Sequence, residues 1–211
     1  MARARKVRRA TIPPVSDQSE FWQRMTSDSI DALGLPDPTK AFHVGRGGDH
    51  PSPDSLPFPN ASAAGIRVDR ALQHAEDLGA ATEEIWRVAQ PQARIVAIEP
   101  DWDTLTFDAG PLAATRAVTR AYADSVRNPI AGRQLARRLR KLGAIDVKQE
   151  PRTEAITSLD HAEAEYRLTE LAAATLNTSA ARSWLNTLAQ RDADNTFLST
   201  VTYFLVSAQK P

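Results

Sequence analysis

The stretch Arg94-Ile95-Val96-Ala97-Ile98-Glu99-Pro100 decides the fold. Its four consecutive apolar residues are typical of a parallel strand buried on both faces, because a half-exposed strand would alternate apolar and polar residues. We expect the strand to end at Glu99-Pro100. Residues 101–103, with sequence Asp-Trp-Asp, would then lie just beyond its carboxyl end.

The segments on both sides of this strand alternate between helical and extended patterns. Residues 36–60 contain six prolines, which predicts a loop with one short strand near 41–44. Helices are expected at 19–35, 77–88, 112–126, 130–142, 161–176 and 180–189, and strands at 41–44, 66–68, 94–98, 144–148 and 197–206. This alternation predicts an α/β layered domain.

The overall composition is that of an ordinary globular protein of 211 residues, with 26 Lys+Arg against 26 Asp+Glu. The absence of cysteine excludes disulfides, thiolate metal sites and a cysteine nucleophile, and it suits a cytoplasmic protein. No run reaches the ~18 apolar residues of a membrane span. No histidine lies near the acids at 101 and 103, so a metal site is not expected.

The charges are unevenly placed. Five basic residues fall within the first ten positions: Arg3, Arg5, Lys6, Arg8 and Arg9. We expect residues 1–18 to form a solvated basic tail and 19–211 to form one domain. The alternative for the tail is an arm for nucleic acid or acidic lipids, but neither nucleic acid nor membrane is an expected partner.

A second basic run lies in the expected helix 130–142. It consists of Arg133, Arg137, Arg138, Arg140 and Lys141. This run is either the solvated side of an amphipathic helix, with cations near its carboxyl end, or a phosphate-binding face. The spacing favours the solvated side.

Several segments occur in an order that resembles one family. They are Leu56-Pro57-Phe58-Pro59, Val68-Asp69-Arg70-Ala71-Leu72-Gln73-His74, Glu84-Ile85-Trp86-Arg87-Val88 and the stretch from Arg94 to Trp102. This order is similar to the class I S-adenosylmethionine-dependent methyltransferases, in particular the small-molecule branch related to quinone biosynthesis. The resemblance covers about residues 56–211. It implies the fourth and fifth strands of that fold, followed by a sixth and seventh strand that form an antiparallel hairpin at the sheet edge.

The cofactor half of the family is only partly represented. Residues 42–48, Phe-His-Val-Gly-Arg-Gly-Gly, resemble the glycine-rich loop after the family's first strand, but only residues 49–55 separate them from Leu56. A parallel crossover needs a dozen or more residues, so the second and third strands cannot fit. The resemblance therefore implies a truncated Rossmann-like methyltransferase sheet of about five strands. The alternative is that the likeness of residues 42–48 is accidental.

The resemblance also implies roles for individual residues. Gly45, Gly47, Gly48 and Asp69 would bind S-adenosylmethionine, His74 would be a catalytic base, and Glu99, Asp101 and Trp102 would face the substrate. The residues allow other interpretations: Asp69 caps the next turn or pairs with Arg70, and His74 is a water-exposed residue at a helix start.

Two functional hypotheses follow. The chain is either a methyltransferase acting on a small-molecule acceptor, or a degenerate relative without cofactor binding that serves as a scaffold, dimerisation partner or non-methylating enzyme. With the second and third strands missing, the strand near 41–44 would lie at a sheet edge. We expect either the first helix to pack over the gap or a homodimer to form across it.

Overall fold

The computed structural model describes residues 19–45 and 51–211, and the expected basic tail lies outside them. Within these residues one sheet has five strands in the order β1-β2-β3-β5-β4. Their bounds are β1 Phe42–Gly45, β2 Ala63–Asp69, β3 Ala89–Phe107, β4 Ile145–Ile156 and β5 Ser199–Gln209. β1, β2 and β3 are parallel, and β5 runs antiparallel between β3 and β4. The predicted α/β fold, with its final antiparallel pair, is confirmed.

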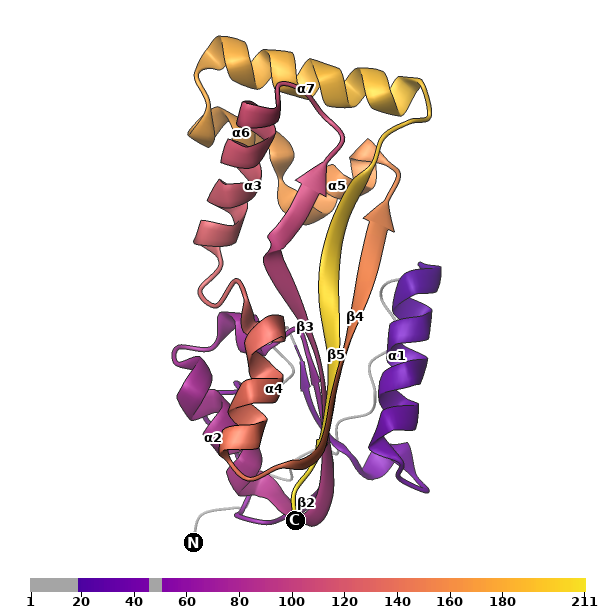
Figure 1. Cartoon of the computed structure of the whole chain (residues 1–211), viewed down its shortest axis with the longest axis vertical. Helices are drawn as coiled ribbons and strands as arrows, with labels where there is room; N and C mark the ends of the chain where they lie inside the picture. Colours follow the sequence, from indigo (N-terminus) through magenta and orange to yellow (C-terminus); the bar gives the residue numbers. More distant parts are fainter. Residues whose placement is uncertain (1–18, 46–50) are drawn as a thin grey trace, which may run out of the picture.

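The helices surround the sheet on two faces and at one end (Figure 1). Their bounds are α1 Glu20–Leu33, α2 Leu78–Val88, α3 Leu112–Ser125, α4 Ala131–Lys141, α5 Leu159–Tyr166, α6 Leu168–Thr175 and α7 Thr178–Ala193, with short 3₁₀ turns η1 Pro38–Lys40 and η2 Leu72–His74. α1 covers one face, and α2 and α4 cover the other. α3, α5, α6 and α7 gather around the far ends of β3, β4 and β5. No helix of the described chain is both long and apolar enough to cross a bilayer.

Helix α1 begins and ends where the sequence predicts. The hydroxyl of Ser19 accepts a hydrogen bond from the backbone N–H of Trp22, and Gly34 closes the helix in the left-handed conformation at φ 61°. Leu35 then packs against β2 so closely that a Cβ on Gly65 would lie 2.7 Å from its Cδ1. The first helix is therefore seated on the face of β2, β3 and β5, whereas the expectation placed it over the gap beside β1.

The short strand β1 lies at the sheet edge, as expected. It pairs with β2 from Phe42 opposite Ile66 to Gly45 opposite Asp69, and no other described strand pairs with it. On the α2 face its Phe42 stacks on Phe58 of the proline-rich loop, with ring centroids 4.1 Å apart. The loop thus covers part of the apolar surface beside this edge.

Helix α4 approaches the sheet more closely than a side chain would permit. A Cβ on Gly132 would lie 2.4 Å from the carbonyl oxygen of Glu99 and 2.9 Å from that of Pro100. Glycine is therefore needed here for backbone contact between helix and strand.

Strand β3 does not end at Glu99-Pro100; that prediction is wrong. It continues to Phe107 because β5 supplies a partner, with Pro100 opposite Tyr203 and Asp101 opposite Thr202. β2 ends opposite Ile98, so beyond that point β3 has a free side on which proline is tolerated. The expected helix 161–176 is also two helices, because Arg167 adopts a left-handed backbone at φ 52° between α5 and α6.

Candidate functional site at the carboxyl edge of the parallel strands

The carboxyl ends of β1, β2 and β3 meet at one edge of the sheet. Gly45 lies opposite Asp69, and Asp69 lies opposite Ile98, the residue before Glu99. Open α/β sheets bind ligands at such an edge. Two of the predicted cofactor residues, Gly45 and Asp69, are therefore neighbours, whereas Gly47 and Gly48 lie outside the described residues.

Asp69 is held by two arginines. Its Oδ1 accepts a hydrogen bond from Nε of Arg70 at 3.0 Å, and its Oδ2 accepts one from Nη2 of Arg67 at 3.2 Å. Burial alone would raise the pKa of this carboxyl, but the charges of Arg70, Arg67 and His43 lower it overall. The pairing with Arg70 that the sequence left open is present.

A layer of buried polar side chains lies between β1, β2 and α1. The Arg67 side chain is 3% exposed and donates from Nε to the hydroxyl of Ser29 at 2.7 Å. Its Nη1 lies 3.4 Å and 3.3 Å from the two ring nitrogens of His43. Burial lowers the pKa of Arg67, opposed by the charge of Asp69. Sequence reasoning did not select Arg67 or Ser29. The sequence feature that could have identified Arg67 is a charged residue within the run 63–68, whose other residues are apolar or glycine.

Arg70 turns back over the first helix. Its backbone is left-handed at φ 52°, and its guanidinium carbon lies 3.8 Å from the centre of the Trp22 ring. The indole Nε1 of Trp22 donates to Oε1 of Glu154 at 2.8 Å, and the ring packs edge-on against Tyr203 at 4.8 Å. Trp22, Arg70 and Glu154 are thus parts of this edge that the sequence analysis did not assign to it.

Glu99 is enclosed by the turn that follows β2. Its Oε1 accepts from the backbone N–H groups of Ala71 and Leu72 at 2.9 and 2.7 Å, and its Oε2 accepts from that of Gln73 at 3.2 Å. Burial raises its pKa to about 8, against the opposite effect of these three donors. Glu99, which was predicted to face the substrate, therefore binds the backbone at the start of η2.

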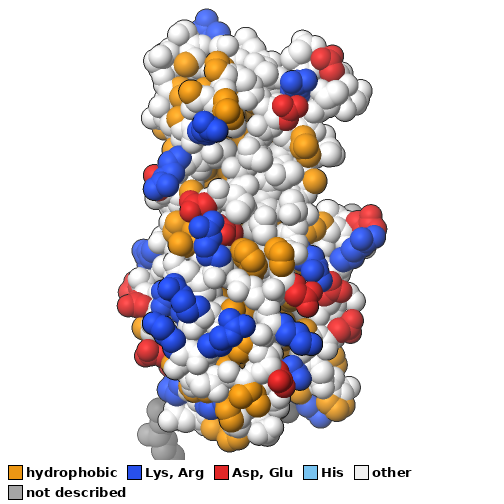
Figure 2. Space-filling view, in the orientation of Figure 1, with side chains coloured by type: hydrophobic (Ala, Val, Ile, Leu, Met, Phe, Trp, Pro, Cys, Tyr) orange, Lys and Arg blue, Asp and Glu red, His pale blue; other side chains and the backbone are white. Residues whose placement is uncertain are grey.

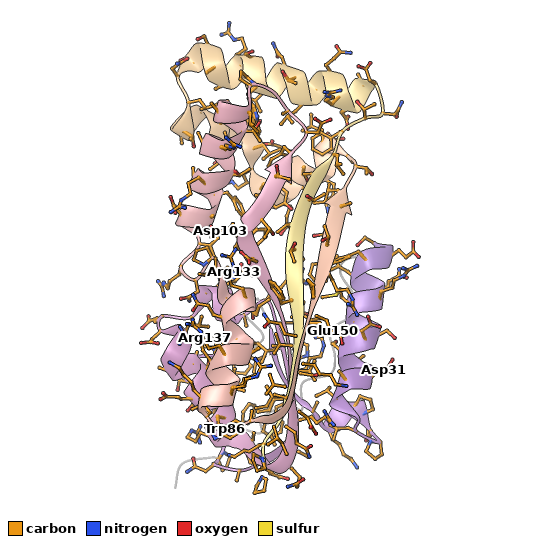
Figure 3. The ribbon with its side chains drawn as sticks, viewed as in Figure 1. Asp31, Trp86, Asp103, Arg133, Arg137 and Glu150 are labelled. Atoms are coloured by element: carbon orange, nitrogen blue, oxygen red, sulfur yellow. The ribbon has the colours of Figure 1, made fainter. Side chains whose placement is uncertain are left out.

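Asp101 and Trp102 do not form one cluster beyond a strand, because both lie within β3 and their side chains alternate between its faces. Asp101 forms a double hydrogen bond with Arg133 of α4, through Nη2 at 2.6 Å and through Nε. Nη1 of Arg133 also lies 3.5 Å from Oδ2 of Asp103. Figure 3 labels both residues. Trp102 is buried and donates from Nε1 to Oε1 of Gln73 at 2.7 Å.

His74, the predicted base, is the last residue of η2 and is exposed. Its backbone N–H donates to the carbonyl of Ala71 at 3.1 Å. His74 thus lies in the turn that follows β2. A catalytic role for it remains a prediction.

Aromatic side chains fill the space beyond this edge. We call them the aromatic cluster: Trp22, Trp102, Phe107, Tyr122, Tyr166 and Tyr203. The hydroxyl of Tyr166 is buried and has no hydrogen-bond partner in the described part of the chain. Burial, and then the charge of Glu154, raises the pKa of Tyr166 above its ordinary value.

Other polar features lie away from this edge. Lys and Arg side chains gather on the surface over α4 (Figure 2), in accord with a solvated helix face.

A groove of about 460 Å³ separates α1 from β4, with Asp31 and Glu150 among its lining residues (Figure 3). Arg94, at the opposite end of the parallel segment of β3, also lines it. Among residues 19–45 and 51–211, no three His, Cys, Asp or Glu side chains gather to hold a metal ion.

The strand order itself decides the fold type. Three parallel strands are followed by an antiparallel pair in which the last strand lies inside the next-to-last. This is the arrangement that the resemblance implies for the first, fourth, fifth, seventh and sixth strands of the family. The chain has a Rossmann-like sheet of the class I methyltransferase type.

Comparison with known proteins gives one relative in sequence and several in structure. The chain is 38% identical over 161 residues to an uncharacterized 37.1 kDa protein in transposon Tn4556 of Streptomyces fradiae, over 74% of this chain and 46% of that protein. It thus spans about half the length of this relative. No known family profile matches the chain.

Two solved structures illustrate the structural likeness. The YcgJ protein of Bacillus subtilis is similar with a TM-score of 0.49 and 15% identity, over 76% of this chain and 69% of that one. The geranyl diphosphate C-methyltransferase of Streptomyces coelicolor, in complex with Mg²⁺, geranyl diphosphate and S-adenosyl-L-homocysteine, has a TM-score of 0.48 and 15% identity, over 90% and 80% of the two chains.

Proposed function

We propose that this chain is a methyltransferase of the class I type that transfers a methyl group to a small-molecule acceptor and, by itself, binds S-adenosylmethionine weakly. The observation that carries the proposal is the edge where Gly45 and Asp69 are paired neighbours and His74 follows on η2. The aromatic cluster packs next to this edge as part of the buried core. A small-molecule acceptor in the cytoplasm is the expected partner.

The described residues do not complete a cofactor site. S-adenosylmethionine presents a ribose diol, for which the resemblance implies a carboxylate on a second strand that is not part of the described sheet. Asp69 has both oxygens bonded to arginines, and Glu99 has both oxygens bonded to backbone N–H groups. Two missing hydrogen bonds to a charged group, at ~1.5–3 kcal/mol each, would weaken binding by ~10²–10⁴.

Titration calorimetry with S-adenosylmethionine and S-adenosylhomocysteine tests this proposal. We expect dissociation constants well above the micromolar range for the purified chain. A dissociation constant of a few micromolar or tighter would contradict weak binding and indicate a complete site. Labelled-methyl transfer to a panel of small molecules bearing hydroxyls or acidic carbons then tests the activity.

His74 is the proposed general base for acceptors that must lose a proton. His74→Ala should lower the rate of methyl transfer to such acceptors by ~10² or more, the usual contribution of a general base. His161, which is exposed on α5, offers a matched control as His161→Ala. Unchanged turnover in both variants would assign His74 to the structure of η2.

A second candidate function is a methyltransferase-like protein without cofactor binding, acting as a scaffold or in a non-methylating reaction. The ion pairs of Asp69 with both Arg67 and Arg70 favour this second candidate. This candidate predicts no saturable binding of either cofactor form at millimolar concentration and no methyl transfer to any acceptor. We also propose, under this second candidate, that two copies of the chain pair across the open edge of β1. Light scattering of the purified chain tests whether it is a dimer.

A further inference from the structure

Arg70 occupies a site whose surroundings suit a cation. Its guanidinium lies 3.8 Å from the Trp22 ring centre, and Nε donates to Asp69 at 3.0 Å. The side chain is 15% exposed, so most of it is removed from water. A guanidinium over a tryptophan face with a carboxylate at its side combines the two elements that bind organic cations.

The ring that receives Arg70 is held in place by other contacts. Trp22 is bonded through Nε1 to Glu154, packs edge-on against Tyr203 and is 3% exposed. None of these contacts involves Arg70. The aromatic face is therefore positioned independently of the cation that covers it.

The charges nearby favour a cation at this point. Burial acts to lower the pKa of Arg70, but the charge of Asp69, the hydrogen bond to it and the charge of Glu165 act to raise it, and the pKa is raised overall. Asp69 also forms an ion pair with Arg67, in which Arg70 takes no part. Loss of the Arg70 side chain would remove one positive charge from the site. It would leave Asp69 paired with Arg67 and would uncover the face of the Trp22 indole.

The backbone of Arg70 also points to a constrained position. A non-glycine residue at φ 52° is uncommon. Its N–H donates to the carbonyl of Ile98 at 2.8 Å, which ties the turn to β3. The turn thus directs the side chain back over α1.

We propose that Trp22 and Asp69 form a binding site for a small organic cation and that Arg70 fills this site as an internal competitor. The ligand class includes the sulfonium of S-adenosylmethionine and a cationic acceptor. The sulfonium assignment rests on the function proposed above, and the cation site itself does not. Binding requires the Arg70 side chain to swing away from the ring.

Removal of the Arg70 side chain tests the site directly. Arg70→Gly and Arg70→Asn both suit a left-handed backbone and lack the cation. With tetramethylammonium as the probe, we expect saturable binding in both variants and at least tenfold weaker binding in the unmodified chain. Arg70→Lys keeps a positive charge and should behave like the unmodified chain. Arg120→Ala, which breaks an ion pair with Asp124 on α3, is the control for loss of an arginine elsewhere.

The location of the bound cation is read from NMR. The indole N–H signal of Trp22, assigned by its loss in Trp22→Phe, should shift on titration of Arg70→Gly. The double variant Arg70→Gly/Trp22→Leu should lose the gained binding. Variants that keep the thermal transition of the unmodified chain but bind no tetramethylammonium would overturn the proposal.

The two cofactor forms separate this inference from the proposed function. A gain of at least tenfold for S-adenosylmethionine in Arg70→Gly, with a smaller gain for the uncharged thioether S-adenosylhomocysteine, supports both. A gain for tetramethylammonium alone supports the cation site and contradicts the assignment to the cofactor. No gain for any cation overturns the site, whatever methyl transfer the unmodified chain performs.

Discussion

The Nε1 of Trp22 donates a hydrogen bond to Oε1 of Glu154 at 2.8 Å, which joins α1 to β4 across 132 residues of chain. Both side chains are buried. A hydrogen bond to a carboxylate in such surroundings contributes more than one between neutral groups. It sets the position at which the first helix lies on the sheet.

Truncation of Trp22 should therefore be costly. We expect Trp22→Ala to lower the free energy of unfolding by about 3–5 kcal/mol, because it removes a buried indole from the core. Urea denaturation measures the loss. Trp86→Ala, at a half-buried tryptophan on α2, is the matched control and should cost less. Equal losses would show that α1 is not seated through Trp22.

A charge at the same position should release the apolar face beneath α1. We expect Trp22→Asp to increase self-association, because α1 packs against the faces of β2, β3 and β5. Light scattering across a concentration series measures the mass. A monomeric variant with an unchanged melting temperature would show that this cover is not needed.

The buried carboxyl of Glu99 should make stability fall as pH rises. Its pKa is raised by burial from 4.5 to about 8, so between these values the folded chain holds a proton that the unfolded chain has lost. The unfolding free energy should then decrease across this window, by at most about 1.4 kcal/mol per pH unit for one proton. Below pH 4.5 both states are protonated and the contribution is complete. Glu99→Gln should flatten the profile, and equal slopes in the two proteins would contradict the assignment.

The orphan hydroxyl of Tyr166 should be dispensable for folding. Tyr166→Phe removes a buried polar atom without a partner in the described chain, so the free energy of unfolding should stay level or rise by about 1 kcal/mol. Thr115→Val is the contrast, because the Thr115 hydroxyl accepts from Nε1 of Trp184 at 2.9 Å. That variant should lose about 1–3 kcal/mol. A destabilised Tyr166→Phe would indicate a partner for the hydroxyl.

Gly132 should tolerate no side chain. Gly132→Ala places a Cβ against the backbone of β3, and we expect a loss of about 1–3 kcal/mol as α4 is pushed outward. Gly79→Ala is the control, because its Cβ would meet only two side-chain ends, Oδ1 of Asp77 at 3.0 Å and Nη1 of Arg138 at 3.3 Å. Thermal melts compare the two. If Gly79→Ala were the more damaging substitution, the close packing of α4 would be refuted.

The strand centres and the helix ends could be predicted because their sequence signals are local. The apolar run at 95–98 marks the centre of β3, and Gly34 and Gly143 mark helix ends through left-handed backbones. The length of β3 could not be predicted in the same way. Its extension to Phe107 depends on pairing with β5, which lies about 100 residues later in the sequence.

The candidate site was predicted only where the ends of parallel strands determine it. Gly45 and Asp69 could be placed together because parallel strands end at a common edge. The contact of Arg70 with Trp22 joins residues from separate elements, and only the packing of α1 brings them together. Asp101 and Trp102 were misplaced because the end of their strand was misplaced.

The position of β5 between β3 and β4 has a consequence for biosynthesis. β4 meets the sheet only through β5, so residues 145–156 have no strand to join until residues 199–209 have left the ribosome. During that interval β3 also presents an unpaired side. Such edges can pair with other chains before folding is complete. Co-translational assembly of this sheet should therefore wait for β5, and slow synthesis between these two segments would lengthen its exposure to aggregation.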